Sequence, residues 1–271
     1  METNMAQTNT TKTSVSLLTI SQYSRMGCLQ ILGELIKTQI YPNIIEWVIV
    51  EGSPNKMDAF VNEQHFLQLE KDAHFGFPLV YVKYEEGQKL SDLRNAGNAV
   101  CKGDIIVCMD DDDYYPPTRV SHAVYKLTTS TALIAGCSKS YIYFYPTNQF
   151  YQFRSFGENH STNNCMAYKR AYLQNHTHAP QMAYAEESSF TNNFSEPMVQ
   201  LNPSKCIVVS GHSANTVDKR MLYQPKYNSM MLTEITEKDA ILDFIPLPVL
   251  IKYEKMFIPT QVHAFTTRDM Q

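Results

Sequence analysis

The stretch that decides the fold is LSDLRNAGNAVCKGDIIVCMDDDDYYPPTRV, residues 90–120. Its central apolar run, 105–109, is short, rich in β-branched residues and bounded by glycine and proline, a pattern that predicts a buried strand. Four consecutive aspartates, Asp110–Asp113, follow the run directly. Because like charges this close raise one another's pKa, we expect a cation to balance them. Carboxylate oxygens favour a hard divalent ion, Mn²⁺ or Mg²⁺.

The position of the acidic run matters, because most acidic runs are solvated loops. In open α/β sheets, ligands bind at the carboxyl ends of the strands, where a strand at 105–109 would deliver these aspartates. A calcium-binding EF-hand loop is disfavoured. Its sixth position would be Tyr115 instead of glycine, and its twelfth would be Ser121 instead of glutamate.

The bulk composition excludes several classes of protein. Of 271 residues, 44% are apolar and 18% are charged, which is ordinary for a soluble globular protein. A net charge of −4 argues against nucleic acid as a partner. No stretch reaches about 18 apolar residues, so no transmembrane segment is expected. Residues 1–13 are polar and predict a disordered tail. Six cysteines without a Cys-x-x-Cys pair suggest buried thiols and a reducing, cytoplasmic location.

Strands and helices alternate over the first 130 residues. Apolar patterns predict strands at 14–20, 44–50, 78–84 and 105–109, and helices at 26–38, 57–71, 90–101 and 118–128. This alternation indicates a single α/β domain with a Rossmann-like, mainly parallel sheet and flanking helices. Further on, 132–145, 150–156 and 206–210 are strand-like, and 162–173 is expected to turn from loop to helix. The tail beyond Arg220 is expected to be irregular around Pro246 and Pro248.

Four segments in this order resemble a known family: VSLLTISQYSR (15–25), IEWVIVEGS (45–53), residues 90–120 and AEESSF (185–190). Over roughly 14–215 the chain is similar to the family 2 glycosyltransferases of the GT-A fold. The resemblance implies metal-dependent transfer of a sugar from a nucleotide-diphosphate donor, with a UDP-sugar favoured, to an acceptor hydroxyl. It implies a GT-A domain at 14–220, with a nucleotide-sugar half at 14–130 and an acceptor half at 131–220. A C-terminal extension at 221–271 is expected to pack on this domain.

The resemblance also assigns residues to the donor site. Asp110 and Asp112 match the DXD motif, whose carboxylates hold the metal, and His212 stands where a late histidine ligand is expected. A lone histidine is as often structural. The residues expected to contact the nucleotide-sugar are Ser21, Tyr23, Glu51, Arg94 and Asp111. The other interpretations are a turn or helix-capping role for Glu51, a surface ion pair for Arg94 and a cap of the following helix for Asp113.

Glycosyl transfer also needs a base for the acceptor hydroxyl. The family carries a Glu-Asp pair in its acceptor half, which corresponds here to Glu186 and Glu187. Glu187 is the predicted base, with Glu186 helping to hold the acceptor. The other interpretation is an exposed acidic pair at a helix start. By family analogy, one carboxylate base without a second nucleophile implies a single displacement that inverts the anomeric centre.

Two other functions share parts of this pattern. A sugar nucleotidyltransferase would normally carry a Gly-rich phosphate loop after the first strand, and SQYSR contains no glycine. A non-catalytic nucleotide- or sugar-binding protein of the same fold is disfavoured by the DXD motif together with Glu187. The acceptor is expected to be a glycan, a protein or a lipid, and an oligomer is compatible with the sequence.

Overall fold

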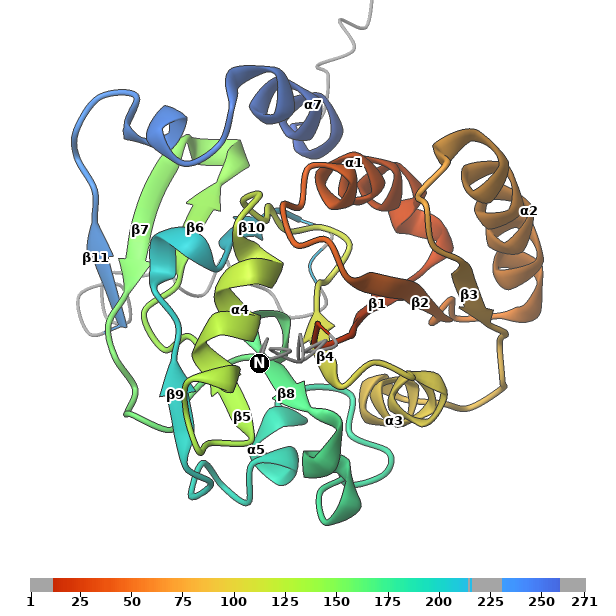
Figure 1. Cartoon of the computed structure of the whole chain (residues 1–271). Helices are drawn as coiled ribbons and strands as arrows, with labels where there is room; N and C mark the ends of the chain where they lie inside the picture. Colours follow the sequence, from red (N-terminus) through yellow and green to blue (C-terminus); the bar gives the residue numbers. More distant parts are fainter. Residues whose placement is uncertain (1–11, 214, 216–230, 259–271) are drawn as a thin grey trace, which may run out of the picture.

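A seven-stranded sheet carries the fold (Figure 1). The computed structural model describes residues 12–213, 215 and 231–258. The sheet has the order β3-β2-β1-β4-β8-β5-β9. Its strands are β1 (Val15–Ser21), β2 (Ile44–Glu51), β3 (Leu79–Val82), β4 (Ile105–Cys108), β5 (Ile134–Gly136), β8 (Ala167–Lys169) and β9 (Met198–Gln200). All of them run parallel except β8, which is antiparallel to both neighbours. The predicted mainly parallel sheet is therefore confirmed.

Helices cover both faces of this sheet. Helices α1 (Met26–Lys37), α2 (Lys56–Ala73) and α4 (Arg119–Thr128) pack on one face, and α3 (Leu90–Val100) packs on the other. Helix α3 lies very close to the sheet at Gly97, where a larger residue would not fit. A Cβ atom at this position would stand 2.3 Å from Leu18 Cδ1. This close approach fixes Arg94, nearly one turn earlier on α3, next to the carboxyl end of β4.

The segment 162–173 contains a strand that the sequence pattern does not predict. Strand β8 lies there between two 3₁₀ turns, at 163–165 and 170–174, so the expected change from loop to helix is wrong. The three residues of β8 are too few to show the alternating apolar pattern of a strand. Their extended conformation comes from pairing with β4 and β5. Arg119, fully buried, donates from Nη2 to the carbonyl oxygens of Cys108, Cys165 and Met166 at 3.2, 3.0 and 2.8 Å. This side chain therefore fastens the entry of β8 to the end of β4.

A smaller sheet, with the order β10-β6-β7-β11, stands beside the first. Its strands are β6 (Tyr141–Phe144), β7 (Gln149–Phe153), β10 (Val208–Gly211) and β11 (Leu232–Glu234). Helix α7 (Leu247–Phe257) packs between α1 and this sheet (Figure 1). The irregular tail expected around Pro246 and Pro248 is wrong for this stretch, because proline is tolerated in the first turn of a helix.

The remaining sequence predictions concern cysteines, termini and membranes. All six cysteines are buried and free, as the sequence suggests. Among the residues that the structure describes, no helix combines the length and apolarity that a bilayer crossing requires. Most of the predicted tail 1–13 lies outside the described residues, as do parts of the extension, 221–230 and 259–271.

Candidate donor and acceptor site

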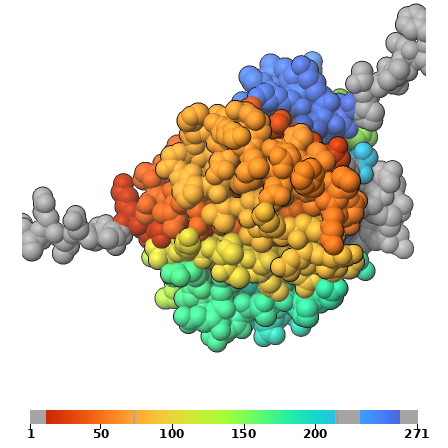
Figure 2. Space-filling model, turned by 90° about the vertical axis from the view of Figure 1, so that its right-hand side faces the viewer, coloured from red at the N-terminus to blue at the C-terminus, as the bar shows by residue number. Residues whose placement is uncertain are grey.

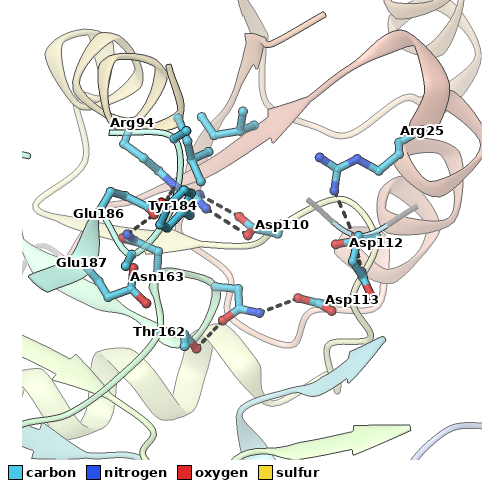
Figure 3. A pocket seen from close by; sticks show the side chains of 16 residues that line it. Arg25, Arg94, Asp110, Asp112, Asp113, Thr162, Asn163, Tyr184, Glu186 and Glu187 are labelled. Carbon is cyan, nitrogen blue, oxygen red and sulfur yellow. Dashed lines mark hydrogen bonds and ion pairs between the residues drawn. The ribbon is translucent and has the colours of Figure 1, made fainter. Parts of the chain in front are cut away.

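A pocket opens at the carboxyl ends of β1 and β4 (Figure 3). Its walls come from the acidic loop 110–113, the start of α3, and two loops of the second half of the chain, 162–164 and 183–187. The predicted site residues that line it are Arg94, Asp110, Asp112, Glu186 and Glu187. The fold therefore brings part of the predicted donor site and both predicted acceptor-side glutamates to one pocket.

Asp110 is held by an arginine from α3. Arg94 Nη1 and Nη2 donate to the two carboxylate oxygens of Asp110 at 2.7 and 2.9 Å (Figure 3). Arg94 is only 3% exposed, and its Nε lies 3.5 Å from Glu186 Oε1. A guanidinium that binds both oxygens of a carboxylate is the strongest form of this pair. Arg94 thus forms buried ion pairs, in place of the surface pair considered from sequence.

Asp112 contacts three polar side chains through one carboxylate oxygen. Its Oδ2 lies 3.0 Å from Arg25 Nη1, 3.1 Å from His212 Nε2 and 3.2 Å from Asn215 Nδ2. The His212 ring stacks flat on Phe257, with centroids 3.8 Å apart. Asp112 and the predicted histidine ligand therefore meet, although 100 positions separate them in the sequence.

The other two aspartates, Asp111 and Asp113, form contacts with neighbouring groups of the protein. Asp111 is fully buried, its Oδ1 lies 3.2 Å from Arg25 Nη1, and burial raises its pKa to about 8. Asp113 accepts from Asn164 Nδ2 at 2.7 Å and from the Ser210 N–H at 2.8 Å. The expected helix cap is wrong for Asp113, because α4 begins after Thr118. Instead, Asp113 ties the acidic loop to the turn at 163–165 and to β10.

The donor set at Asp112 fits a divalent cation of the Mn²⁺ type. One carboxylate oxygen and one imidazole nitrogen stand together, and such ions accept both kinds of ligand. Within the described part of the chain, no three His, Cys, Asp or Glu side chains come together as a metal site. Asp112 and His212 would thus supply two ligands, and the others would come from a bound diphosphate and water. Asp110 faces Arg94 in this structure.

The predicted base lies across the pocket from the acidic loop. Glu187 opens the short helix α5 (Glu187–Phe190), and burial together with repulsion from Glu186 raises its pKa to about 7. Glu186 is 3% exposed and accepts from Asn163 Nδ2 at 2.9 Å. Ala185 precedes the pair with φ +54°, a conformation that costs an L-residue about 1–2 kcal/mol. Backbone strain therefore sits directly beside the two carboxylates.

A loop that the sequence analysis did not single out forms the rim of the pocket. Gln181 N–H donates to Asp92 Oδ1 at 3.1 Å, and Met182 N–H donates to Ser91 Oγ at 2.9 Å, so α3 holds the loop. The side chain of Tyr184, 69% exposed, stands at the rim (Figure 3). An exposed aromatic ring beside a polar pocket is suited to stack on a sugar face.

The residues predicted at the first two strand tips lie outside the pocket lining. Ser21 pairs with Glu51 across β1 and β2, and both are buried. Glu51 Oε1 accepts from the Ser53 N–H at 2.7 Å, and Oε2 accepts from an asparagine of α2 and from the Tyr81 hydroxyl. Tyr23, 38% exposed, donates its N–H to Ser53 Oγ. Glu51 thus organises the turn after β2, and a contact with the nucleotide stays a prediction.

Comparisons with known proteins agree with this fold. The model of "Glycosyl transferase family 2" matches residues 30–190. S. aureus TarS 1-349, solved in complex with UDP-GlcNAc, has a TM-score of 0.56 at 13% identity over 75% of this chain and 60% of that chain. The mannosyltransferase PcManGT from Pyrobaculum calidifontis, in complex with GDP-Man and Mn²⁺, has a TM-score of 0.60 at 15% identity over 91% of this chain and 70% of that chain. No curated protein matches the sequence.

Proposed function

Because the chain belongs to glycosyl transferase family 2 and has the GT-A fold, we propose that it moves a sugar from a nucleotide-diphosphate donor to an acceptor hydroxyl. A UDP-sugar is the favoured donor, and the acceptor is a glycan, a protein or a lipid. TarS and PcManGT were solved with UDP-GlcNAc and with GDP-Man, so the fold accommodates either nucleotide. Six free, buried thiols support the prediction of a reducing, cytoplasmic location.

One observation carries this proposal: the acidic loop and the Glu186–Glu187 pair face each other across a single pocket. A donor bound at Asp112 would present its anomeric carbon toward the opposite wall. Glu187 stands on that wall and would remove the proton of the acceptor hydroxyl as the new bond forms. Its pKa of about 7 suits a general base at neutral pH. One carboxylate acting on the face opposite the leaving group produces inversion.

The side chains around Asp112 would help to stabilise the negative charge of the leaving group. Mn²⁺ or Mg²⁺ held by Asp112 and His212 would neutralise the diphosphate. Arg25 brings a positive charge to the same side of the pocket, 3.0 Å from Asp112. Arg94 holds Asp110 and approaches Glu186, so it fixes the geometry of both walls at once. In this proposal, Arg25 stands on the leaving-group side of the pocket, and Glu187 stands on the acceptor side.

The experiment that tests this proposal is a thermal-shift panel of UDP, GDP, CDP and dTDP, each with and without Mn²⁺. We expect one diphosphate to raise the melting temperature only when the metal is present. Asp112→Ala should abolish that shift, whereas Asp72→Ala, an exposed carboxylate on α2, should leave it unchanged. The same shift in Asp112→Ala as in the parent chain would contradict the assigned donor site.

A further inference from the structure

Helix α7 touches the donor site from behind at three separate points. Phe257 stacks on His212 with the two rings nearly parallel, 3° apart. The hydroxyl of Tyr253 donates to the backbone carbonyl of Asp113 at 2.9 Å, in a fully buried contact. Met256 Sδ lies 3.1 Å from Cys28 Sγ, near the start of the helix that follows Arg25. Each contact reaches a different segment that surrounds Asp112.

The side of α7 that makes these contacts is firmly packed. Tyr253 and Phe257 are one helical turn apart, and both rings lie against Tyr145, in the turn that joins β6 to β7, with ring centroids 5.8 and 5.0 Å away. A Cβ atom on Gly27 would stand 2.6 Å from Met256 Cε, so α1 and α7 approach closely. Figure 2 shows α7, in blue, seated on the surface of the N-terminal part of the chain. The helix is thus braced against both α1 and the second sheet.

A stacked aromatic ring restricts an imidazole to one plane. His212 needs such a restriction, because it follows the last residue of β10 and leaves the sheet there. Groups behind a metal-binding histidine orient it, and their loss commonly weakens metal binding 10- to 100-fold. The residues that match the family model end at 190, so α7 lies outside that part of the chain.

We propose that α7 is a positioning element of the metal site, in which Phe257 orients His212 and Tyr253 holds the acidic loop at Asp113. This inference rests on the proposed function, because it assumes that Asp112 and His212 bind the metal. Neither Phe257 nor Tyr253 touches the substrate in this assignment. Their effect passes through His212 and the backbone of the acidic loop.

The test is a Mn²⁺ titration followed by electron paramagnetic resonance, with the full chain and with UDP and GDP as parallel probes. Phe257→Leu keeps an apolar side chain but removes the ring, and we expect the Kd for Mn²⁺ to rise about tenfold. Phe257→Tyr keeps the ring and should retain the parent Kd. Tyr253→Phe should weaken binding by a smaller factor, about threefold. Ile251→Ala, at a partly exposed position on α7, is the matched control and should change nothing.

The outcomes separate the inference from the function on which it rests. A purely structural role for α7 would lower the fraction of folded protein, and so the number of Mn²⁺ ions bound per chain, without changing the Kd. An unchanged Kd in folded Phe257→Leu, checked by circular dichroism, would overturn the inference alone. Absence of nucleotide-dependent Mn²⁺ binding in the parent chain would overturn the proposed function and the inference with it.

Discussion

Arg94 on α3 and Asp110 at the tip of β4 face each other as a two-pronged ion pair, with distances of 2.7 and 2.9 Å. The same guanidinium approaches Glu186, so one cation links the acidic loop to the acceptor wall. Arg94 is nearly inaccessible, whereas Asp110 is partly open to the pocket. The pair therefore engages Asp110 with a side chain of α3, whereas Asp112 interacts with Arg25 and His212.

Arg94→Gln should lower the free energy of unfolding by about 3 kcal/mol, because it leaves the Asp110 carboxylate without its partner. Urea denaturation measures the change. The double variant Arg94→Gln/Asp110→Asn should recover more than half of the loss, since the uncompensated charge is gone. A double variant whose loss equals the sum of the two single losses would show that the pair is not coupled.

Glu187→Gln should lower kcat by roughly 10²- to 10⁴-fold, which is the usual contribution of a general base. The nucleotide-induced thermal shift should persist, because the proposed donor site lies at the opposite wall. This result would separate catalysis from binding. Full donor turnover by Glu187→Gln would rule out Glu187 as the base.

The pH profile of the parent enzyme should report the same carboxylate. Glu187 acts only when deprotonated, and its pKa is raised to about 7, so kcat/KM should rise between pH 6 and 8 and level off above. Glu186→Gln removes the neighbouring negative charge and should move this rise to lower pH. A profile that stays flat from pH 5 to 9 would contradict the assignment.

Ala185→Gly should stabilise the protein by about 0.5–1 kcal/mol, because glycine adopts φ +54° without the cost that alanine bears. It should also lower kcat, since greater backbone freedom beside Glu186 and Glu187 would hold the two carboxylates less firmly. Ala183→Gly, in the same loop but without a positive φ, is the control and should not stabilise. Thermal melts and turnover on the same preparations check both effects.

Tyr184→Ala should raise the KM for a carbohydrate acceptor about tenfold while the donor KM stays within a factor of two. A tenfold change corresponds to about 1.4 kcal/mol, which is within the range of one aromatic stacking contact. Tyr184→Phe keeps the ring and should behave like the parent. Equal changes in the donor and acceptor KM would place Tyr184 outside the acceptor side.

The part of the site carried by residues 90–120 could be predicted from the sequence, because it depends on local signals. A short apolar run ending in Asp110–Asp113 marks the end of a buried strand, and the alternation of strands and helices places that end at a known edge of the sheet. Arg94 lies in the same segment, so its nearness to this edge could be expected, although its pairing with Asp110 could not.

The rest of the site and of the fold depends on contacts between segments that are distant in the sequence. Such contacts leave no periodic pattern of apolar residues that could predict them. Arg25 reaches Asp112 across 87 positions, and a basic residue just after the first strand is a weak signal by itself. Tyr184 lies in a loop that hydrogen bonds hold against α3, about 90 positions earlier in the chain. Strand β8 is extended because it pairs with β4, about 60 residues earlier in the chain. The three residues of β8 alone are too few to predict this pairing.

Strand β8 also limits how the molecule can move. Residues 14–130 and residues 131–220 share one continuous hydrogen-bonded sheet, because β8 pairs with β4 on one side and with β5 on the other. Arg119 adds two hydrogen bonds across the same boundary, to the carbonyl oxygens of Cys165 and Met166. The two halves therefore cannot swing open about a hinge as separate rigid bodies. Substrate entry and product release must instead depend on motions of the surface loops around the pocket.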